Sequence, residues 1–449
     1  MILNIPLKVE RILRALTDHG YEAYAVGGCV RDSILGRNPY DWDITTSALP
    51  EQVKEIFPRT VDTGLQHGTV TVMMEHEGFE VTTYRVDGEY EDGRHPKDVT
   101  FTASLEEDLK RRDFTINAMA YHPETGLVDL FHGVEDLEQK IIRCVGDPLE
   151  RFTEDALRIM RAVRFSAQLG FTIEENTYKA LSVLAPNLKQ ISAERIRTEL
   201  EKILVSAHPD YIRTAYDTGM TAVFFPEWDA CMKTEQNTPH HCYTVGEHII
   251  KSLTLVREDR ILRLAMLLHD IGKPVAKTTD DTGRDHFKKH AEYGEKMAKD
   301  ILRRWKYDNE TISLVTRLVK WHDCRPNPDL TSVRRAVNRM GEDLYPYYTE
   351  VHMADVLAQS TYRREEKLSR MALAEECYQE ILRKDQCLSL KKLAVNGKDL
   401  MAAGYPKGKE MGKLLQLLLD HVLEYPEENE KEHLLSILPE LMKKEREKV

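Results

Sequence analysis

The spacing of hydrophobic residues along the chain changes near residue 146. Before that point, short runs rich in β-branched residues alternate with amphipathic stretches, and the runs at 68–74 and 79–84 predict two β-strands. After it, apolar residues recur at helical intervals to the end of the chain. The pattern therefore predicts an α+β fold in which the N-terminal domain carries the sheet and the later domains are all helical.

Proline residues and shifts in composition divide the sequence into four predicted domains. These are a mixed head at 1–145, a helical neck at 146–225, a histidine-rich helical domain at 226–360 and a helical tail at 361–449. In the head, the polar segment 86–99 contains two glycines and a proline, so it predicts a loop.

The composition argues against a disulfide-rich or membrane-spanning protein. The seven cysteines are scattered and form no CxxC pair, as expected for reduced thiols in the cytoplasm. No apolar run reaches the ~18–20 residues that span a bilayer, and the N-terminal segment predicts an amphipathic helix instead of a signal peptide. The net charge of −12 is only weak evidence against RNA binding, because an RNA site needs just a local basic stripe. We predict a cytoplasmic protein without a membrane partner; the sequence leaves its oligomeric state open.

A double glycine near the N terminus is the first candidate for chemistry. Gly27 and Gly28 end a short apolar run, and without a Cβ they let the backbone approach a ligand closely. A helix that begins after them would direct its free N–H groups and the side chain of Arg31 toward a triphosphate.

An acidic pair, Asp41 and Asp43, follows this motif after nine residues. On a strand, side chains at i and i+2 share a face, and two adjacent carboxylates repel each other unless a cation lies between them. Mg²⁺ is the expected cation, because it binds through one or two carboxylates plus substrate phosphates. Two such ions can activate a 3′ hydroxyl and stabilise a leaving pyrophosphate. Glu80 on the second predicted strand is the candidate third carboxylate, and a solvated acidic turn is the alternative.

Together these motifs resemble the class II nucleotidyltransferases of the polymerase-β superfamily, which include CCA-adding enzymes and bacterial poly(A) polymerases. The segments 66–72, 111–120 and 152–165 resemble further elements of that family, so the resemblance covers the first half of the chain. It implies a polymerase-β-like head, Mg²⁺ as cofactor, and addition of nucleotides from CTP and ATP to the 3′ end of tRNA without a nucleic-acid template.

The segment 152–165 predicts one continuous helix with a polar face that can read a base. Thr153 is the predicted N-cap, and Asp155 and Arg158 are neighbours at i and i+3. A carboxylate beside a guanidinium matches the donor and acceptor on the pairing edges of cytosine and adenine, and it leaves unpaired groups against uracil and guanine. A surface ion pair is the plain alternative. The resemblance places five residues at the nucleotide: Arg112, Asp155, Arg158, Arg161 and Arg164.

Arg164 points nearly opposite to Asp155 on such a helix. We therefore also consider that it meets phosphates, the acceptor stem of the tRNA or a buried carboxylate.

The segment after the second predicted strand bears on the branch of the family. Residues 83–96 resemble the flexible loop that enzymes adding the terminal A possess and CC-only enzymes lack. The segment 64–68 differs from the basic GRRF-like element of bacterial poly(A) polymerases. Full CCA addition is preferred, and A-only addition and poly(A) synthesis stay open as alternatives.

A second motif lies in the histidine-rich domain. An apolar stretch from 264 predicts a helix that ends at Gly272, with His269 and Asp270 in its last turn. Together with His241 and Asp355, these residues resemble the metal ligands of the HD phosphohydrolase superfamily. Imidazole and carboxylate ligands suit Mn, Fe, Ni or Zn without selecting one.

The same resemblance gives extra ligands to some HD proteins, here at His290 and His322. His240, His248 and His286 are interpreted as ordinary polar contacts. An active site of this kind would hydrolyse phosphate esters of nucleotides or damaged RNA ends, whereas the alternative is a scaffold without activity. A different interpretation of the whole chain is an HD hydrolase whose head only binds RNA. The segment 395–414 in the tail resembles the tRNA-contacting region of HD-bearing CCA-adding enzymes.

Overall fold

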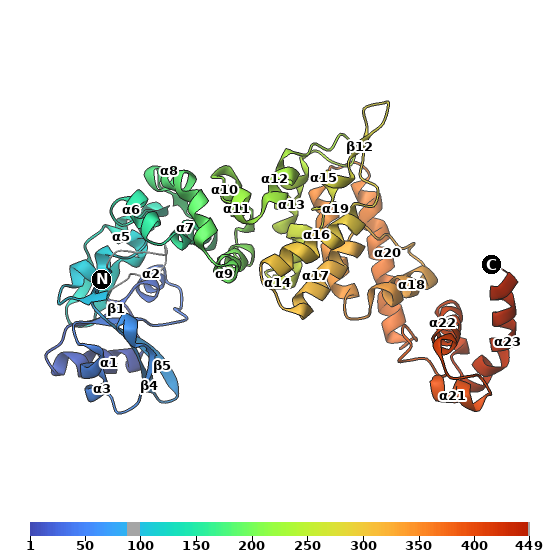
Figure 1. Ribbon diagram of the computed structural model, residues 1–449, viewed down its shortest axis with the longest axis horizontal. Coiled ribbons are helices and arrows are strands. Elements are labelled where there is room, and N and C mark those ends of the chain that lie inside the picture. Colours follow the sequence, from blue (N-terminus) through green and yellow to red (C-terminus); the bar gives the residue numbers. More distant parts are fainter. Residues whose placement is uncertain (88–98, 448–449) are drawn as a thin grey trace. The chain divides into compact units, whose positions relative to one another are not determined.

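The computed structural model describes residues 1–87 and 99–447. The chain divides into two compact units, Met1–Asp229 and Ala230–Val449 (Figure 1). Among the described residues, every helix is too short or too polar to traverse a lipid bilayer.

A seven-stranded sheet forms the scaffold of the first unit, in the order β3-β4-β5-β2-β1-β8-β9. Its strands are β1 Ala23–Val26, β2 Ile44–Thr46, β3 Thr60–Gly64, β4 Thr69–Met74, β5 Glu77–Thr83, β8 Met119–His122 and β9 Gly126–Asp129. β4 and β5 pair antiparallel and confirm the two strands predicted from β-branched runs. β2 and β5 are parallel, with Ile44 opposite Val81, so the residues that precede these two lie side by side.

Helices and short strands complete the part of the first unit that carries the sheet. They are α1 Leu7–Asp18, α2 Gly28–Ile34, α3 Pro50–Ile56, α4 Leu105–Lys110, α5 Gly133–Gln139, β6 Arg85–Asp87, β7 Val99–Phe101, β10 Ile141–Ile142 and β11 Thr172–Ile173. α1 buries Val9, Ile12, Leu13 and Leu16, which recur at helical spacing on one face. α1 contacts β1, and α3 contacts β4 and β5 (Figure 1).

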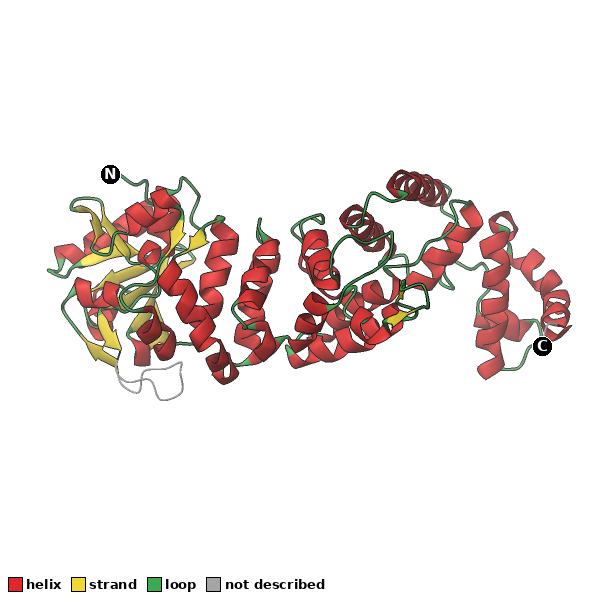
Figure 2. Cartoon of the chain, turned by 90° about the horizontal axis from the view of Figure 1, so that it is seen from above, coloured by secondary structure: helices red, strands yellow, loops and turns green. Residues whose placement is uncertain are grey.

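The rest of the first unit is helical, as predicted. Its helices are α6 Pro148–Glu154, α7 Leu157–Leu169, α8 Glu175–Leu184, α9 Ala193–Leu204, α10 Ile212–Asp217, α11 Thr221–Phe224 and α12 Pro226–Lys233, the last of which crosses into the second unit. Figure 2 shows the contrast between the strand-rich part of the chain and the helices that follow it. The α+β class expected from the sequence is therefore confirmed.

The prediction of one continuous helix over 152–165 is wrong, because the helical backbone is interrupted at Asp155, between α6 and α7. Asp155 adopts an extended conformation (φ −134°, ψ 103°), and its Oδ1 accepts the Leu157 N–H at 2.9 Å. This local bond gives the backbone an alternative to the helical pattern. Thr153 is not an N-cap: its hydroxyl donates to the Leu149 carbonyl at 2.7 Å within α6, which Asp147 caps instead.

The second unit is built almost entirely from helices. They are α13 Val245–Leu253, α14 Arg260–Leu268, α15 Lys273–Ala276, α16 His290–Arg304, α17 Asn309–Trp321, α18 Leu330–Met340, α19 Tyr345–Ala358, α20 Arg364–Arg383, α21 Gly397–Ala402, α22 Lys409–Glu424 and α23 Lys431–Glu447, with a short hairpin of β12 Thr278–Thr279 and β13 Asp285–His286. α13, α14, α17 and α19 pack against one another. α14 ends at Leu268, earlier than the predicted Gly272, so His269 and Asp270 directly follow the helix instead of forming its last turn.

Candidate functional site

Two of the three predicted carboxylates of the head line one small cavity. Asp41 and Asp43 precede β2 instead of lying within it, but the Val26 N–H donates to the Asp43 carbonyl at 3.0 Å and continues the pairing of β1 with β2. The parallel register of β2 and β5 places Asp43 beside Glu80. Both residues line a cavity of about 190 Å³, together with Arg111 and Arg112.

Negative charge accumulates at this cavity. Burial raises the pKa of the Asp43 carboxyl, the attraction of Arg112 opposes that rise, and repulsion from Asp41 adds to it. The pKa of Glu80 is also raised, first by burial and then by the charges of Asp43 and Asp41. Three mutually repelling oxygen ligands fit a hard divalent cation such as Mg²⁺, which would relieve the repulsion.

A glycine is required where β1 turns into α2. Gly27 has φ +83°, in the left-handed region, and a Cβ at this position would lie 3.1 Å from Arg112 Nη1. Arg31, expected to face a triphosphate, is instead held from within: its Nε donates to Asp32 at 2.9 Å and its Nη1 donates to Asn117 Oδ1 at 2.7 Å. Only 8% of Arg31 is exposed.

A fully buried acid, Asp108, positions Arg111 and Arg112, two of the three arginines that line the cavity with Arg85. Arg111 Nη2 lies 2.8 Å from Asp108 Oδ1, Arg112 Nη2 lies 3.4 Å from Asp108 Oδ2, and the Thr45 hydroxyl donates to the same carboxylate at 3.0 Å. Burial raises the pKa of Asp108, but the charges of Arg111 and Arg112 outweigh that effect and leave it lowered. Sequence reasoning missed Asp108, although its i+3 and i+4 spacing to the two arginines was a usable signal.

Asp155 and Arg158, predicted to read a base together, contact different residues in this structure. Arg158 Nη1 donates to Glu154 Oε2 at 2.7 Å, and its Nη2 donates to the Arg111 carbonyl at 2.9 Å. Asp155 Oδ2 instead accepts a longer bond of 3.4 Å from Arg195. The i,i+3 argument required a continuous helix, and the break after Glu154 puts Glu154 where Asp155 was expected.

The two later arginines of α7 bind buried acids. Arg161 Nε and Nη2 lie 2.7 and 2.5 Å from Asp113 Oδ2. Arg164 Nε lies 3.1 Å from Glu199 Oε2, and both side chains are less than a tenth exposed. Of the three alternatives considered for Arg164, the contact with a buried carboxylate is therefore the one present in this structure. Burial and the neighbouring Arg161 lower the pKa of Arg164 to about 10.

Phe165 joins these arginines into one cluster. Its ring lies 5.0, 5.3 and 4.1 Å from the guanidinium carbons of Arg31, Arg161 and Arg164. Asn117 links the cluster further, since its amide donates to Asp113 Oδ1 at 3.1 Å while its oxygen accepts from Arg31. The network thus connects α2, the segment after α4, and α7.

In the second unit, six side chains form two adjoining groups that share one carboxylate. The first histidine group comprises His248, His269, Asp270 and Asp355, and the second histidine group comprises Asp270, His290 and His322. Within each group the candidate ligand atoms lie within 4.8 Å of one another. Asp270 Oδ2 is 3.3 Å from His269 Nε2, and its Oδ1 is 3.5 Å from His290 Nε2. One carboxylate therefore faces both groups.

Backbone bonds fix the protonation of three of these histidines. The Nδ1 atoms of His269, His290 and His322 lie 2.7, 2.8 and 2.6 Å from the carbonyl oxygens three residues earlier. Because a carbonyl only accepts, each Nδ1 donates its proton to that carbonyl, so in the neutral ring each Nε2 carries the lone pair that a metal would use. The Nε2 atoms of His290 and His322 are only 3.1 Å apart. Such facing lone pairs and carboxylates fit one or two divalent transition metals.

His248 takes the ligand position that the sequence argument gave to His241. His248 Nε2 lies 2.9 Å from Asp355 Oδ1 and 3.3 Å from His269 Nε2. His241 precedes α13, and its ring centroid is 5.1 Å from that of His248. Burial and nearby Lys273 lower the pKa of His241 to about 2. The overlooked signal was the place of His248 on the buried face of α13.

Of the three histidines expected to make ordinary polar contacts, only His248 joins a metal-binding group. His286 Nε2 lies 2.7 Å from Asp280 Oδ2, and the His240 ring packs edge-on against Tyr362 at 5.0 Å. His290 and His322, the predicted extra ligands, form the second histidine group with Asp270.

Close backbone packing holds the two groups together. A Cβ on Gly272 would lie 2.2 Å from the carbonyl oxygen of His290, so only glycine permits this approach of α15 to α16. The cavity of about 350 Å³ that borders the groups is rich in cations, namely Lys273, Arg284, Lys288, Lys289 and Arg325. A phosphate ester would meet favourable charge there.

Three family models match successive parts of the chain. The poly A polymerase head domain matches residues 23–143, a probable RNA and SrmB-binding site of polymerase A matches residues 170–232, and a putative domain 2 of tRNA nucleotidyltransferase matches residues 286–438. The head model includes the three candidate carboxylates.

A CCA-adding enzyme of Limosilactobacillus reuteri (strain DSM 20016) is 36% identical over 413 residues, which cover 91% of this chain and 90% of that protein. This chain belongs to the CCA-adding enzyme family. A CCA-adding enzyme of Leuconostoc mesenteroides is 57% identical over 201 residues, which span 45% of this chain and half (50%) of that relative. The structure of the Bacillus stearothermophilus CCA-adding enzyme in complex with CTP matches with a TM-score of 0.73 and 30% identity, covering 100% of both chains.

Membership of the CCA-adding enzyme family confirms the resemblance drawn from the head motifs. The segment 83–96, which favoured addition of the terminal A, lies largely at 88–98, outside the described residues.

Proposed function

We propose that the head and neck of this protein add C, C and A to the 3′ end of tRNA, using CTP and ATP and no nucleic-acid template. The observation that carries the proposal is the convergence of Asp41, Asp43 and Glu80 beside Arg112 in a member of the CCA-adding enzyme family. The match to an enzyme solved with CTP supports this choice of substrate. A match of residues 170–232 to an RNA-binding model supports RNA as the partner.

The three carboxylates would hold Mg²⁺. When bound, Mg²⁺ screens the phosphates and favours the 3′ hydroxyl as nucleophile. Arg111 and Arg112, held by Asp108, offset the charge of the triphosphate without leaving the cavity wall. Gly27 keeps a Cβ away from Arg112 Nη1, which it would approach to 3.1 Å, so this guanidinium group retains its place.

The proposed nucleotide set adds the double glycine and Arg31 to the five residues carried over from the family. Its members are Gly27, Gly28, Arg31, Arg112, Asp155, Arg158, Arg161 and Arg164. Asp155 is able to re-pair, because its 3.4 Å bond to Arg195 is long and its side chain is about a fifth (19%) exposed. We expect its Oδ2 to accept from the exocyclic amine of cytosine or adenine, so Asp155→Ala should relax discrimination against UTP in single-nucleotide incorporation.

A tRNA transcript without its CCA end, supplied with Mg²⁺ and CTP, ATP or both, tests the activity. Two additions with CTP and a third only with ATP are expected on a sequencing gel. Asp41→Ala should abolish all additions, whereas Asp62→Ala, an exposed acid paired with Lys54, should leave them intact. One A added only to tRNA ending in CC would assign A-only addition, and a long ladder would assign poly(A) synthesis. Wild-type turnover in Asp41→Ala would end the metal assignment.

The second unit supports a second candidate function, hydrolysis of phosphate esters. The observation that favours it is the pair of histidine groups sharing Asp270, with three imidazoles already in the ligand tautomer. His248, His269, Asp270 and Asp355 would hold one transition metal, and Asp270 with the second group would hold another. Such metals supply an activated water at neutral pH. Lys273, whose Nζ lies 2.7 Å from Asp270, belongs to the cationic wall that would bind the phosphate.

Hydrolysis of a 2′,3′-cyclic nucleotide by the full chain, loaded in turn with Mn²⁺, Fe²⁺, Ni²⁺ or Zn²⁺, tests this function. His248→Asn should abolish hydrolysis and lower the bound metal, whereas His76→Asn, at an exposed position of the first unit, should change neither. If the metal-loaded protein hydrolyses neither the cyclic ester nor a phosphomonoester, the second unit is a scaffold without hydrolase activity.

We infer a cytoplasmic location from the proposed tRNA substrate and from the chemistry of the thiols. None of the seven cysteines, all of which lie in the described part of the chain, is joined in a disulfide, and four of them, Cys29, Cys144, Cys231 and Cys387, are buried.

A further inference from the structure

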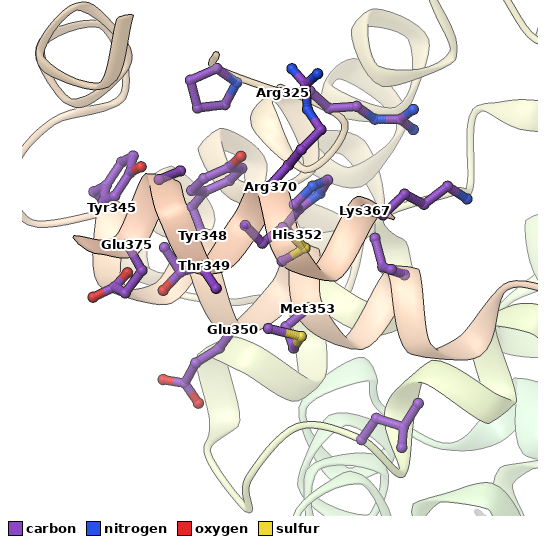
Figure 3. Close-up of a pocket in the computed structure, with 16 residues that line it drawn as sticks. Arg325, Tyr345, Tyr348, Thr349, Glu350, His352, Met353, Lys367, Arg370 and Glu375 are labelled. Atoms are coloured by element: carbon purple, nitrogen blue, oxygen red, sulfur yellow. The ribbon is translucent and has the colours of Figure 1, made fainter. Parts of the chain in front are cut away.

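The cavity of about 440 Å³ between α19 and α20 offers no open aromatic ring to a ligand (Figure 3). Tyr345, Tyr348 and His352 are at most 6% exposed. The Tyr345 and His352 rings both pack against Tyr348, with ring centroids 5.3 and 5.6 Å away. These side chains belong to the core of the second unit. Partly exposed side chains that can bind a metal gather instead at the tail helices α22 and α23 (Figure 1).

Two histidines and one glutamate of the tail bring three metal-binding atoms together. His421 lies in the last turn of α22, Glu428 ends the short turn Pro426–Glu428, and His433 lies in the first turn of α23. His421 Nε2 is 2.6 Å from Glu428 Oε2, and His433 Nε2 is 2.9 Å from the same oxygen. The three candidate ligand atoms lie within 4.8 Å of one another. Three separate segments thus direct one ligand atom each to a common point, which we call the tail cluster.

Hydrogen bonds hold the turn that carries Glu428. Asn429, the next residue, accepts the Ala394 N–H at 2.9 Å through its Oδ1 and donates to the Lys392 carbonyl at 3.1 Å through its Nδ2. The Glu428 N–H donates to the Tyr425 carbonyl at 3.1 Å. The backbone that presents the carboxylate is therefore fixed before any ion binds, which lowers the ordering cost of binding.

Buried apolar residues hold the two helices beside their histidines. His421 is followed by Val422, which is fully buried. His433 is followed by Leu434, which is fully buried as well. The side chains of the cluster are themselves partly exposed, namely His421 by 16%, Glu428 by 36% and His433 by 40%. Solvent therefore reaches a cluster with a fixed backbone, so an ion can enter and keep water as a further ligand.

Negative charge predominates around the tail cluster. The segment 424–432 contains five glutamates and one lysine. That lysine, Lys431, lies with its Nζ 2.5 Å from Asp399 Oδ1, and Glu424 pairs with Arg335 at 2.9 Å. The surrounding charge thus favours a cation at the cluster over an anion.

The plain alternative is that two imidazole N–H groups donate to one carboxylate oxygen. A tetrahedral Zn²⁺ with bonds of ~2.0–2.1 Å separates neighbouring ligand atoms by about 3.3 Å, so the cluster needs to widen by less than about 1 Å to admit the ion. The distance of 2.9 Å between His433 and Glu428 equals that between His248 and Asp355 in the first histidine group. Two imidazoles, one carboxylate and a position open to water form a ligand set that Zn²⁺ uses in proteins.

We propose that His421, Glu428 and His433 form a further metal site, which binds Zn²⁺ and is separate from the head and from the two histidine groups. The ion joins α22, the turn Pro426–Glu428 and α23, and it thereby stabilises their packing. Mg²⁺ does not replace it, because Mg²⁺ prefers oxygen ligands in an octahedral arrangement. Neither nucleotide addition nor phosphate-ester hydrolysis, as proposed above, requires this site.

Hydrogen exchange of the full chain, freed of metal with a chelator and then titrated with Zn²⁺, tests the site. Peptides of α23 report on the tail cluster, and peptides of α13 report on the first histidine group. When free Zn²⁺ exceeds the Kd tenfold, exchange in α23 that requires opening of the cluster should slow about tenfold. The same concentration of Mg²⁺ should leave exchange in α23 unchanged.

Matched variants separate the tail cluster from the histidine groups. His433→Asn and Glu428→Gln each remove one ligand, so each should abolish the slowing in α23 and lower the zinc content of the protein. Glu432→Gln, at an exposed position beside His433, should retain both. His248→Asn should lose the Zn²⁺ response of α13 and keep that of α23, which distinguishes failure of the hydrolase site from failure of this one. Circular dichroism melting in chelator checks that each variant is folded.

Four results would overturn the proposal. They are unchanged exchange in α23 when Zn²⁺ is added to the wild type, a full response in both His433→Asn and Glu428→Gln, an equal response to Mg²⁺, or loss of the α23 response in His248→Asn. The first would leave the tail cluster as hydrogen bonds alone, and the last would assign the effect to the histidine groups.

Discussion

The Asp113→Asn substitution tests whether buried charge holds α7 in place. Asp113 is 7% exposed and uses both carboxylate oxygens. Its Oδ1 accepts from the Phe114 N–H at 2.8 Å and from Asn117 at 3.1 Å, while its Oδ2 accepts the two bonds from Arg161. An asparagine amide has one oxygen and one NH₂ group, so in either orientation a donor would face two donors.

The expected cost follows from those contacts. Two charge-assisted bonds contribute about 1.5–3 kcal/mol each, and removing one member of a buried ion pair costs about 3–5 kcal/mol. The Arg161 side chain is 33% exposed and regains hydration when released, which favours the lower end of the range. We expect the free energy of unfolding of the first unit to fall by about 3 kcal/mol.

Hydrogen exchange measured by mass spectrometry provides the assay, because peptides of α7 report on the first unit and peptides of α17 provide an internal reference. Asp62→Asn is the matched exposed control. In a double-mutant cycle, Asp113→Asn added to Arg161→Met should cost little beyond Arg161→Met alone. A loss below about 1 kcal/mol, or strict additivity, would refute the reasoning.

The pH dependence supplies a second check on the same substitution. Burial raises the pKa of Asp113, but Arg161 and the hydrogen bond from Asn117 more than offset it, leaving the pKa below its ordinary 3.8. The stabilisation is thus complete above 3.8 and is lost as pH falls through the lower folded pKa. The difference between wild type and Asp113→Asn should be constant from neutral pH to about pH 5 and narrow at lower pH.

Because the pKa values of Asp43 and Glu80 are raised, nucleotide addition should decline on the acid side at a higher pH than ordinary carboxylates would dictate. A higher Mg²⁺ concentration should move that decline to lower pH, since Mg²⁺ and protons compete for the same carboxylates. If the pH of the decline does not depend on the Mg²⁺ concentration, Asp43 and Glu80 are not metal ligands. His248→Asn should lower bound transition metal measured by mass spectrometry and His241→Asn should not, whereas equal losses would restore His241 as a ligand. Gly272→Ala should lower the melting temperature, because the new Cβ clashes with the His290 carbonyl oxygen at a cost of about 1–3 kcal/mol. An unchanged melting temperature would show that α15 and α16 can move apart without loss of stability.

Local patterns in the sequence were enough for much of the head. The β-branched runs predicted β4 and β5, because alternation along a strand depends on neighbouring residues only. The convergence of Glu80 with Asp43 was suggested by residue type, but the parallel pairing of β2 with β5 is what places them side by side.

Predictions from helical spacing were wrong where the helix was not continuous. The i,i+3 relation of Asp155 and Arg158 assumed regular geometry, and one side-chain bond from Asp155 to the Leu157 N–H ended that regularity. Partners such as Asp113 for Arg161 are distant in the sequence, so no local rule could assign them.

The sequence by itself determined the fold class, the family and most chemistry-bearing residue types, because periodicity and motif spacing are properties of contiguous residues. Only the tertiary structure decided which acid binds which arginine, and that His248 instead of His241 meets Asp355. The physical reason is that charges and ligands act over a few ångströms in space, and packing of α13 against α14 and α19 sets those distances.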